Sequence, residues 1–329
     1  FDEIYLNKVH TLSLSPESVG KFHDMKIAYT PLHGAGVRLV PASLRKWGFT
    51  NVSLVEEQAV IDGNFPTVES PNPEERKTMA KAIELGSRLG ADLVLATDPD
   101  SDRIGVALRN AKGEYVLLNG NQTLSLIMAY QLTRWSELGR LDGKEFVVKT
   151  IVTSQMPNVM AAHFGVKCYD CLTGFKYIAR IIRNNEGKAT YIGGGEESFG
   201  YLAGDFVRDK DAVSACSLVA EAAAWTRDTM GLTLYEWLQK LYVEFGFFRE
   251  GLVSVVRKGM EGAAEIQRMM VDYRADPPRE IAGSPVVKIN DFKLLESTDV
   301  RTGAKTPIEE EASNVLQWFA ADGTVVSVR

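Results

Sequence analysis

Short apolar runs that alternate with helical stretches constrain the fold of this chain more than any other feature. Such runs occupy residues 25–30, 51–56, 92–97 and 146–151, and helical patterns lie between them. Apolar runs of this length, bounded by turn residues, are typical of buried strands. Strands that alternate with helices indicate layered α/β domains, in which helices cover the faces of a sheet. We therefore expect an α/β fold.

The pattern changes twice along the 329 residues, a length that exceeds one ordinary hydrophobic core. We expect a first α/β domain over residues 1–120 and a second over 121–246. After Gly246 the order of expected helices and strands becomes that of an α+β domain. We expect residues 247–329 to form a third domain that begins with a strand over 251–257. Within the first domain, Pro73 and Gly90 suggest a helix over residues 73–89.

Composition narrows the choice of partner. The net charge is −6, which argues against nucleic acid as the main partner, and the hydrophobic share of 45% is ordinary for a folded soluble protein. No apolar run approaches the roughly 20 residues of a membrane span. Three cysteines are too few, and odd in number, for a secreted disulfide framework. We expect a cytoplasmic protein with no membrane partner; the sequence leaves its oligomeric state open.

The sharpest motif is T-D-P-D-S-D-R at residues 97–103, directly after an expected strand. In an extended segment the carboxylates of Asp98, Asp100 and Asp102 point the same way and converge. Three converging like charges need a cation, and carboxylate oxygens suit Mg²⁺. An EF-hand loop requires Gly at its sixth position and Glu at its twelfth, where Arg103 and Arg109 stand, so that reading is excluded. A solvated acidic turn remains the alternative.

Two glycine-containing loops are candidates for ligand contact. T-P-L-H-G-A-G at residues 30–36 joins a strand to a helix and is either a tight turn or a ligand-facing loop. It is not a dinucleotide fingerprint, because Leu39 stands where the third glycine belongs. In G-G-G-E-E-S-F-G at 193–200, the carboxylate of Glu196 and the hydroxyl of Ser198 are spaced to bind sugar hydroxyls.

Other polar positions keep two readings each. Thr173 precedes Gly174 at the start of an expected helix and is either an N-cap or a ligand contact. The segment R-D-K-D at 208–211 is either a charged helix cap or the source of a lysine for phosphate binding or proton transfer. Lys149, at the end of a strand, is equally ambiguous, and Arg103 either holds a substrate phosphate or pairs with an aspartate. We interpret Cys168-x-x-Cys171 as incidental, because a structural zinc site needs four ligands.

Taken together, these segments resemble the α-D-phosphohexomutase superfamily and, within it, the phosphoglucomutase/phosphomannomutase family. The resemblance runs over essentially the whole chain and is carried by the motifs at residues 30–36, 97–103, 172–176 (L-T-G-F-K), 195–200 and 208–211. It implies the second, third and fourth of the family's four domains. These are two consecutive three-layer α/β/α domains followed by a truncated α+β domain that binds phosphate.

The resemblance also implies roles for individual residues. One Mg²⁺ per chain is expected on Asp98, Asp100 and Asp102. Lys210 and Arg103 are the candidate catalytic residues. The candidate substrate-binding residues are Glu196, Ser198, Thr173, Gly174, Lys149, Arg208 and His33.

The implied activity of the parent protein is the interconversion of glucose 1-phosphate and glucose 6-phosphate. It proceeds through a phosphoserine and the intermediate or activator glucose 1,6-bisphosphate; phosphopentomutase and phosphomannomutase activities are the alternatives. The family's phosphoserine motif, T-A-S-H-N-P, does not occur in this sequence, and neither does its phosphate-gripping motif, R-P-S-G-T-E-P. We therefore expect a fragment cut at both ends. Alone, it would be a non-catalytic module that binds metal and a small sugar phosphate.

Overall fold

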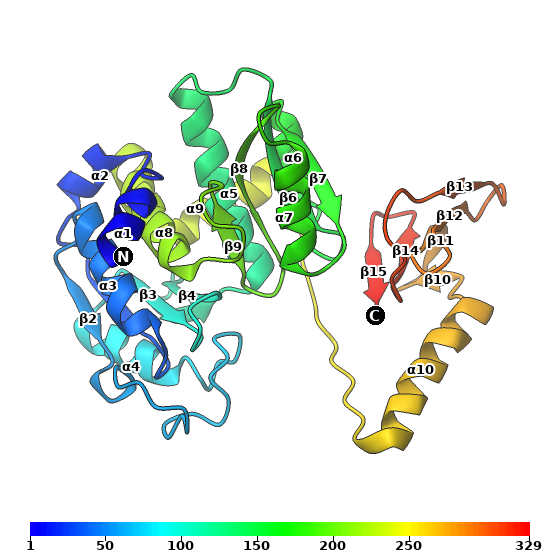
Figure 1. Ribbon diagram of the computed structural model, residues 1–329, viewed down its shortest axis with the longest axis horizontal. Helices are drawn as coiled ribbons and strands as arrows, with labels where there is room; N and C mark the ends of the chain where they lie inside the picture. Colours follow the sequence, from blue (N-terminus) through cyan, green and yellow to red (C-terminus); the bar gives the residue numbers. More distant parts are fainter. The chain divides into compact units, whose positions relative to one another are not determined.

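A computed structural model describes all residues from 1 to 329. The chain forms two compact units, Phe1–Glu250 and Gly251–Arg329 (Figure 1). Each unit is described by itself below. The first contains two sheets, and the second contains one.

The first sheet has five strands in the order β2-β1-β3-β4-β5. Its parallel core consists of β1 (Ile27–Thr30), β2 (Val52–Leu54) and β3 (Leu93–Thr97), and β1 lies in the middle. The strands β4 (Ile104–Arg109) and β5 (Tyr115–Leu117) add an antiparallel edge. Every residue of β1 and β3 is buried, which matches the near-continuous apolar runs seen in the sequence.

Two helices form the connections between the parallel strands of this sheet: α3 (Gly36–Trp47) joins β1 to β2, and α4 (Ala80–Leu89) lies between β2 and β3. In α3, the buried residues Val40, Leu44 and Trp47 recur at helical spacing, and Gly48 ends the helix in the left-handed conformation. The second helix, α4, is preceded by a short 3₁₀ turn, η1 (Glu56–Gln58).

The predicted helix over residues 73–89 is therefore wrong in its first half. Its amino-terminal residues form turns instead of helix. The side chain of Asn72 accepts a hydrogen bond from Glu74 N (3.1 Å), and Thr78 Oγ1 donates to Ser70 O (2.8 Å). Such local side-chain bonds compete with a helical backbone.

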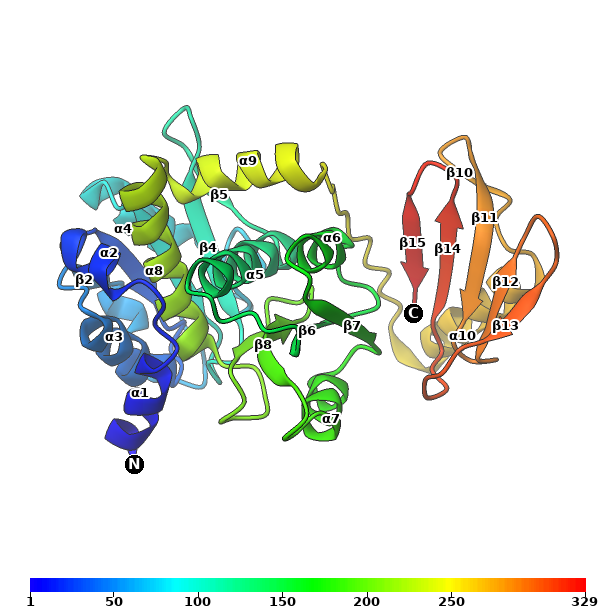
Figure 2. The same cartoon turned by 90° about the horizontal axis from the view of Figure 1, so that it is seen from above.

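The second sheet has four strands in the order β7-β6-β8-β9. Three of them are parallel: β6 (Glu145–Thr150), β7 (Lys167–Cys171) and β8 (Thr190–Gly195). The short strand β9 (Tyr201–Ala203) is antiparallel to β8 and was not predicted. Figure 2 shows the helices α5 (Gly120–Glu137) and α6 (Met156–His163) on one face of this sheet.

On the other face lies α7 (Phe175–Asn184), which is strongly amphipathic and buries Phe175, Ile178 and Ile182 (Figure 2). Phe146 and Val148 of β6 share a core with α7, whereas Val147 belongs to the larger core that contains α5 and α6. This alternation along a central strand is what a sheet covered on both faces requires. The second part of the chain is thus a three-layer α/β/α arrangement, as predicted.

The long helix α8 (Ala212–Met230) joins the two halves of the first unit. It packs against α3, against α2 (Pro16–Lys21) and against α5, and α9 (Leu234–Phe245) follows it. One continuous core contains buried residues from both sheets. The helix is alanine-rich, and small side chains allow its neighbours to approach closely.

A buried carboxylate anchors the amino-terminal segment to this helix. Glu221 of α8 is fully buried and accepts hydrogen bonds from Leu14 N (2.9 Å), Ser15 N (3.0 Å), Ser13 Oγ and the Tyr130 hydroxyl (2.7 Å). The donors come from the connection between α1 (Asp2–His10) and α2, and from α5. A buried carboxylate is tolerated only when it is hydrogen-bonded in this way.

In the second unit, α10 (Gly259–Ala275) precedes a sheet of six strands. The path order is β13-β12-β11-β14-β15, and β10 pairs with β11. Their bounds are β10 (Glu280–Ile281), β11 (Ser284–Asp291), β12 (Glu296–Asp299), β13 (Lys305–Pro307), β14 (Leu316–Ala320) and β15 (Val325–Val328). Met270 of α10 packs with Val286, Leu316 and Trp318 of the sheet.

The strand predicted over residues 251–257 is absent: this segment has no regular secondary structure, and Leu252 and Val253 are each 86% exposed. Its apolar, β-branched composition mimics a strand, but a strand forms only where another strand supplies hydrogen-bond partners.

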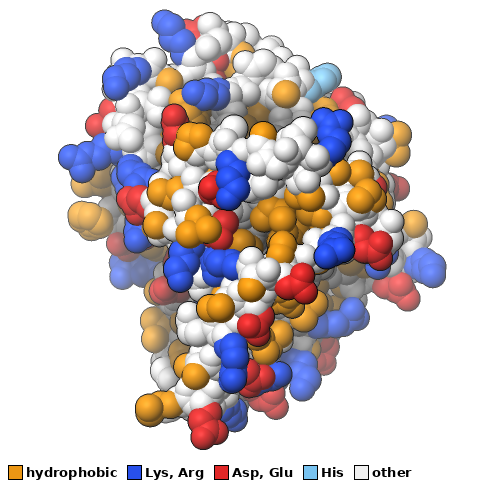
Figure 3. All heavy atoms as spheres, turned by 90° about the vertical axis from the view of Figure 1, so that its right-hand side faces the viewer, with side chains coloured by type: hydrophobic (Ala, Val, Ile, Leu, Met, Phe, Trp, Pro, Cys, Tyr) orange, Lys and Arg blue, Asp and Glu red, His pale blue; other side chains and the backbone are white.

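On the face shown in Figure 3, Lys and Arg side chains are interspersed with Asp and Glu, and apolar groups are scattered among them. None of the helices has both the length and the apolar character needed to cross a bilayer.

We expect Glu221→Ala to lower the free energy of unfolding of the first unit by about 3 kcal/mol, because several buried donors lose their acceptor. Urea unfolding followed by tryptophan fluorescence measures the loss, because four of the five tryptophans, among them Trp225 next to Tyr130, lie in the first unit. The exposed Glu244→Ala on α9 is the control and should be neutral. Equal midpoints for the two variants would contradict the anchoring role.

Candidate functional site

The loop between β3 and β4 is a tight turn. Asp98 N donates to Arg103 O (3.3 Å), Ser101 N donates to Asp98 O (3.0 Å), and Ser101 adopts the left-handed conformation (φ 61°). Our prediction of an extended segment is wrong, but the turn produces the predicted convergence. One carboxylate oxygen from each of Asp98, Asp100 and Asp102 lies within 4.8 Å of the others.

The buried side chain of Asp98 holds this turn together by accepting hydrogen bonds from it. This side chain is fully buried; Oδ1 accepts from Asp102 N (3.1 Å) and Arg103 N (3.0 Å), and Oδ2 accepts from Arg103 Nε (2.5 Å). Burial raises the pKa of Asp98, and the hydrogen bonds from Arg103 oppose that rise only in part. Asp102 is half-buried and Asp100 is exposed, so the cluster opens towards solvent on one side.

Two cations face the acidic cluster. Lys210 Nζ lies 2.8 Å from Asp102 Oδ2, and Arg103 Nε lies 3.8 Å from Asp102 Oδ1. Burial lowers the pKa of Lys210, but the hydrogen bond and charge of Asp102 outweigh it, so the pKa lies above its ordinary value. Arg103 Nη1 also lies 3.7 Å from Glu74, a neighbour that the sequence did not reveal.

Carboxylate oxygens that meet at one point are the donor set that Mg²⁺ prefers, and the exposed side of the cluster leaves room for water or a substrate oxygen. The residues present therefore fit a magnesium ion.

The loop at residues 195–200 lies directly beside the acidic turn. Arg103 and Gly200 form an antiparallel bridge, and Ile104 N donates to Phe199 O (3.0 Å). A Cβ on Gly200 would lie 2.2 Å from Lys210 Cδ, so this glycine gives the lysine its path to Asp102. Two motifs about a hundred residues apart in the sequence thus form one site.

Glu196 connects this loop to the start of α7. Its Oε1 accepts a hydrogen bond from Gly174 N (2.7 Å), and its side chain is buried. The N-cap position of α7 is Gly174 (φ 121°), so no side chain accepts a hydrogen bond from the first turn of the helix. The N-cap reading of Thr173 is therefore wrong, and Thr173 Oγ1 is buried without a hydrogen-bond partner.

Ser198 lies half-buried in the same loop. Its neighbour Glu197 accepts from Thr150 Oγ1 (2.9 Å) and Thr153 Oγ1 (3.2 Å), which tie the loop to the end of β6. The sequence motif itself did not indicate that Glu197 would have this structural role.

Three candidates for substrate contact have other partners here. His33 is buried, and its ring nitrogens contact Val60 O (2.9 Å) and Thr67 Oγ1 (2.8 Å), so it holds the following loop and offers no nitrogen to a sugar. Lys149 is fully buried and pairs with Asp170 (2.9 Å). Arg208 pairs with Glu186, although it borders a cavity next to the acidic turn. His33 and Lys149 have protein partners in this structure, and their assignment as substrate contacts stays a prediction.

The first glycine loop supports the acidic turn from behind. Ala35 N donates to Pro99 O (2.8 Å), and a Cβ on Gly34 would lie 2.3 Å from Pro99 Cα. Gly36 is similarly enclosed, because a Cβ there would meet Tyr29 and Thr97. Of the two readings of this motif, the packed tight turn describes the structure.

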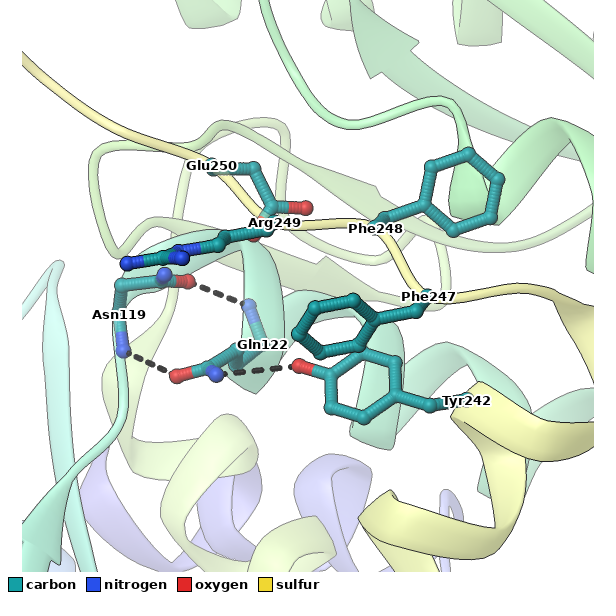
Figure 4. A pocket seen from close by; sticks show the side chains of 7 residues that line it. All are labelled: Asn119, Gln122, Tyr242, Phe247, Phe248, Arg249 and Glu250. Atoms are coloured by element: carbon teal, nitrogen blue, oxygen red, sulfur yellow. Dashed lines mark hydrogen bonds between the residues drawn. The ribbon is translucent and has the colours of Figure 1, made fainter.

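The first unit contains two cavities, one of which borders the acidic turn. One, of about 420 Å³, is lined in part by Asp100, Ser101 and Lys210. The other, of about 280 Å³, lies between the start of α5 and the segment after α9 (Figure 4). There the capping box of Asn119 and Gln122 meets the Tyr242 hydroxyl, to which Gln122 Nε2 donates (3.0 Å).

Comparison with protein families agrees with this arrangement. The model of phosphoglucomutase/phosphomannomutase α/β/α domain II matches residues 3–113, and that of domain III matches residues 119–245. The chain belongs to the phosphoglucomutase/phosphomannomutase family. Our own domain boundaries after residues 120 and 246 stay predictions.

Curated relatives of this chain include phosphoglucomutases. Phosphoglucomutases from the Staphylococcus aureus strains MRSA252 and N315 are each 35% identical over 302 residues, which is 92% of this chain and 54% of theirs. The chain thus spans about half the length of the curated relatives it matches.

Solved structures share the fold at low sequence identity. Parafusin, a phosphoglucomutase of Paramecium in its open form, matches with a TM-score of 0.64 at 15% identity, over 99% of this chain and 54% of that one. A phosphoglucomutase/phosphomannomutase family protein from Burkholderia thailandensis matches with a TM-score of 0.57 at 17% identity, over 92% of this chain and 55% of that one.

We expect Gly34→Ala to destabilise the first unit by about 2 kcal/mol, because its methyl group would overlap backbone that cannot move without opening the acidic turn. Thermal unfolding measures the loss. Gly20→Ala is the control, since nothing lies within 4 Å of its added Cβ; because Gly20 lies in the helix α2, the change should not lower stability and should raise it slightly. An unchanged midpoint for Gly34→Ala would show that the two loops are not packed as described.

Proposed function

We propose that this chain supplies the metal-binding and sugar-binding parts of a phosphoglucomutase that interconverts glucose 1-phosphate and glucose 6-phosphate. The observation that carries the proposal is the meeting of the aspartate cluster, Lys210 and the 195–200 loop in one place. The relatives named phosphoglucomutase support glucose as the first choice of sugar. Phosphopentomutase and phosphomannomutase are the alternatives.

In this proposal Asp98, Asp100 and Asp102 hold Mg²⁺. When bound, the ion neutralises the negative charge that develops on a phosphoryl group during transfer. Asp98 gives the site its rigidity, because the hydrogen bonds it accepts fix the turn before any ligand arrives. A preorganised site of this kind costs little reorganisation at the moment of reaction.

Lys210 and Arg103 are the proposed cationic partners of the phosphoryl group. The ammonium group of Lys210, already at Asp102, remains charged at neutral pH and can donate to a phosphoryl oxygen or assist a proton transfer. Arg103 is fixed by Asp98 and reaches outward with its remaining donors.

The loop containing Glu196 and Ser198, next to Gly174, is the proposed contact for sugar hydroxyls. A mutase must accept its sugar in two orientations so that either phosphate faces the metal. Hydroxyl contacts tolerate such a reversal better than close shape complementarity does. Glucose 1,6-bisphosphate would be the intermediate that turns over between the two half-reactions.

For this chain taken alone, we propose binding without turnover. The sequence contains no serine segment of the T-A-S-H-N-P type, so we expect the phosphoryl carrier to lie elsewhere in the parent protein. No disulfide joins the three cysteines, in keeping with a proposed cytoplasmic location.

Metal binding is tested by Asp100→Asn. Since Asp100 is the exposed member of the cluster, the change removes a ligand with little effect on folding, and we expect Mg²⁺ affinity, measured by calorimetry, to fall at least about tenfold. Asp24→Asn, an exposed aspartate outside the cluster, is the control. Equal affinity for wild type and Asp100→Asn would favour the solvated acidic turn.

Turnover is tested by a coupled assay for glucose 6-phosphate formed from glucose 1-phosphate. We expect conversion by the product of the whole reading frame and none by this chain alone. Mannose 1-phosphate and ribose 1-phosphate are the comparison substrates, and a preference for either would replace glucose in the proposal. Conversion by this chain alone would refute the proposal that it lacks the nucleophilic serine.

A further inference from the structure

Tyr5 forms a hydrogen bond with Asp211 that no sequence motif predicts. Its hydroxyl, on α1, lies 2.7 Å from both carboxylate oxygens of Asp211, which is 206 residues away in the chain. Burial and the charge of Asp211 raise the pKa of Tyr5, so the hydroxyl stays protonated and donates. Asp211 itself is only 7% exposed, and hydrogen bonds to a carboxylate in such surroundings are among the stronger ones in proteins.

Asp211 is the N-cap of α8. Its Oδ1 accepts from Val213 N (3.0 Å) and Ser214 N (3.4 Å), while its own backbone N–H donates to Tyr201 O (2.9 Å). The start of α8 is therefore held by one carboxylate, and Tyr5 is the side chain that holds the carboxylate.

The residues on either side of Asp211 both reach the acidic turn. Lys210, before it, places Nζ 2.8 Å from Asp102. Ala212, after it, donates its backbone N–H to Ser101 O (3.1 Å). A shift of the cap would move both contacts together, because only one residue separates them.

We propose that Tyr5 is a positioning residue for the site: through Asp211 it holds Lys210 against Asp102 and holds the start of α8 against the acidic turn. Describing that site as one for metal and phosphate rests on the proposed function. Tyr5 does not itself touch the aspartate cluster.

The cavity beside the turn makes this role consequential. Tyr5, Asp100, Ser101 and Lys210 all line the same space of about 420 Å³. If the N-cap of α8 loosens, the side chain of Lys210 has room to move into this cavity and away from Asp102. Close packing would otherwise have kept Lys210 in place without help from Tyr5.

The test is the reactivity of single lysines towards an amine-acylating reagent, read by mass spectrometry. In Tyr5→Phe we expect Lys210 to react about fivefold faster, as suits the loss of one hydrogen bond that holds it. Lys149, which is fully buried and ion-paired, should stay unreactive and so reports that the fold is intact. A reactive Lys149, or an unchanged Lys210, would overturn the proposal.

Tyr115→Phe is the matched control. It too removes the hydrogen bond of a buried tyrosine hydroxyl, here to the Ala91 carbonyl, at a point outside α1 and outside the start of α8. It should leave Lys210 reactivity at the wild-type value, and an equal rise in this variant would show that any destabilisation frees Lys210.

A second variant protects the test against misfolding of the first. Asp211→Asn keeps an oxygen for the helix cap but weakens the bond to Tyr5, so Lys210 should again react faster. Adding Tyr5→Phe to it should produce no further rise, since Tyr5 acts through Asp211; additive increases would overturn the proposal.

Titration of the wild-type chain with Mn²⁺ separates the two proposals. If Mn²⁺ binds to the wild-type chain and Lys210 reacts faster in Tyr5→Phe, both proposals stand. If wild type does not bind Mn²⁺, the proposed function fails, while Lys210 reactivity still decides the role of Tyr5.

Discussion

The ion pair between the buried carboxylate of Asp98 and the half-buried guanidinium of Arg103 is the interaction on which the site depends. A carboxylate without solvent contact is costly by several kcal/mol unless donors surround it, and the turn of residues 98–103 wraps its own backbone amides and the Arg103 side chain around it. That wrapping brings Asp100 and Asp102 to the same side. The like charges are then met by Arg103 and Lys210, so the protein can hold the cluster together before any ion arrives.

Glycines make this arrangement possible at two places by letting backbone approach closely. Gly34 admits Pro99 of the acidic turn, and Gly200 admits the side chain of Lys210. Neither has a left-handed backbone, so their role is space and not conformational freedom. Both glycines therefore act by allowing close packing around the acidic turn.

The start of α8 links the two α/β halves at the site. Asp211 caps this helix, Lys210 and Ala212 contact the acidic turn from the first half, and Tyr201 of the second sheet accepts the Asp211 N–H. The amino-terminal helix adds Tyr5 to the same point. Elements from four parts of the first unit therefore position one lysine, which makes its location a property of the whole unit.

The sequence by itself determined the layered α/β order, the family, and the residues of the acidic cluster, because periodicity and short motifs are local. Only the tertiary structure decided which motif residues face the site: His33 and Lys149 are buried among protein partners, and Thr173 is not the cap it resembled. It alone supplied the Tyr5–Asp211 contact. The physical reason is that burial and long-range hydrogen bonds depend on which chain segments meet in space, and a local pattern does not encode that.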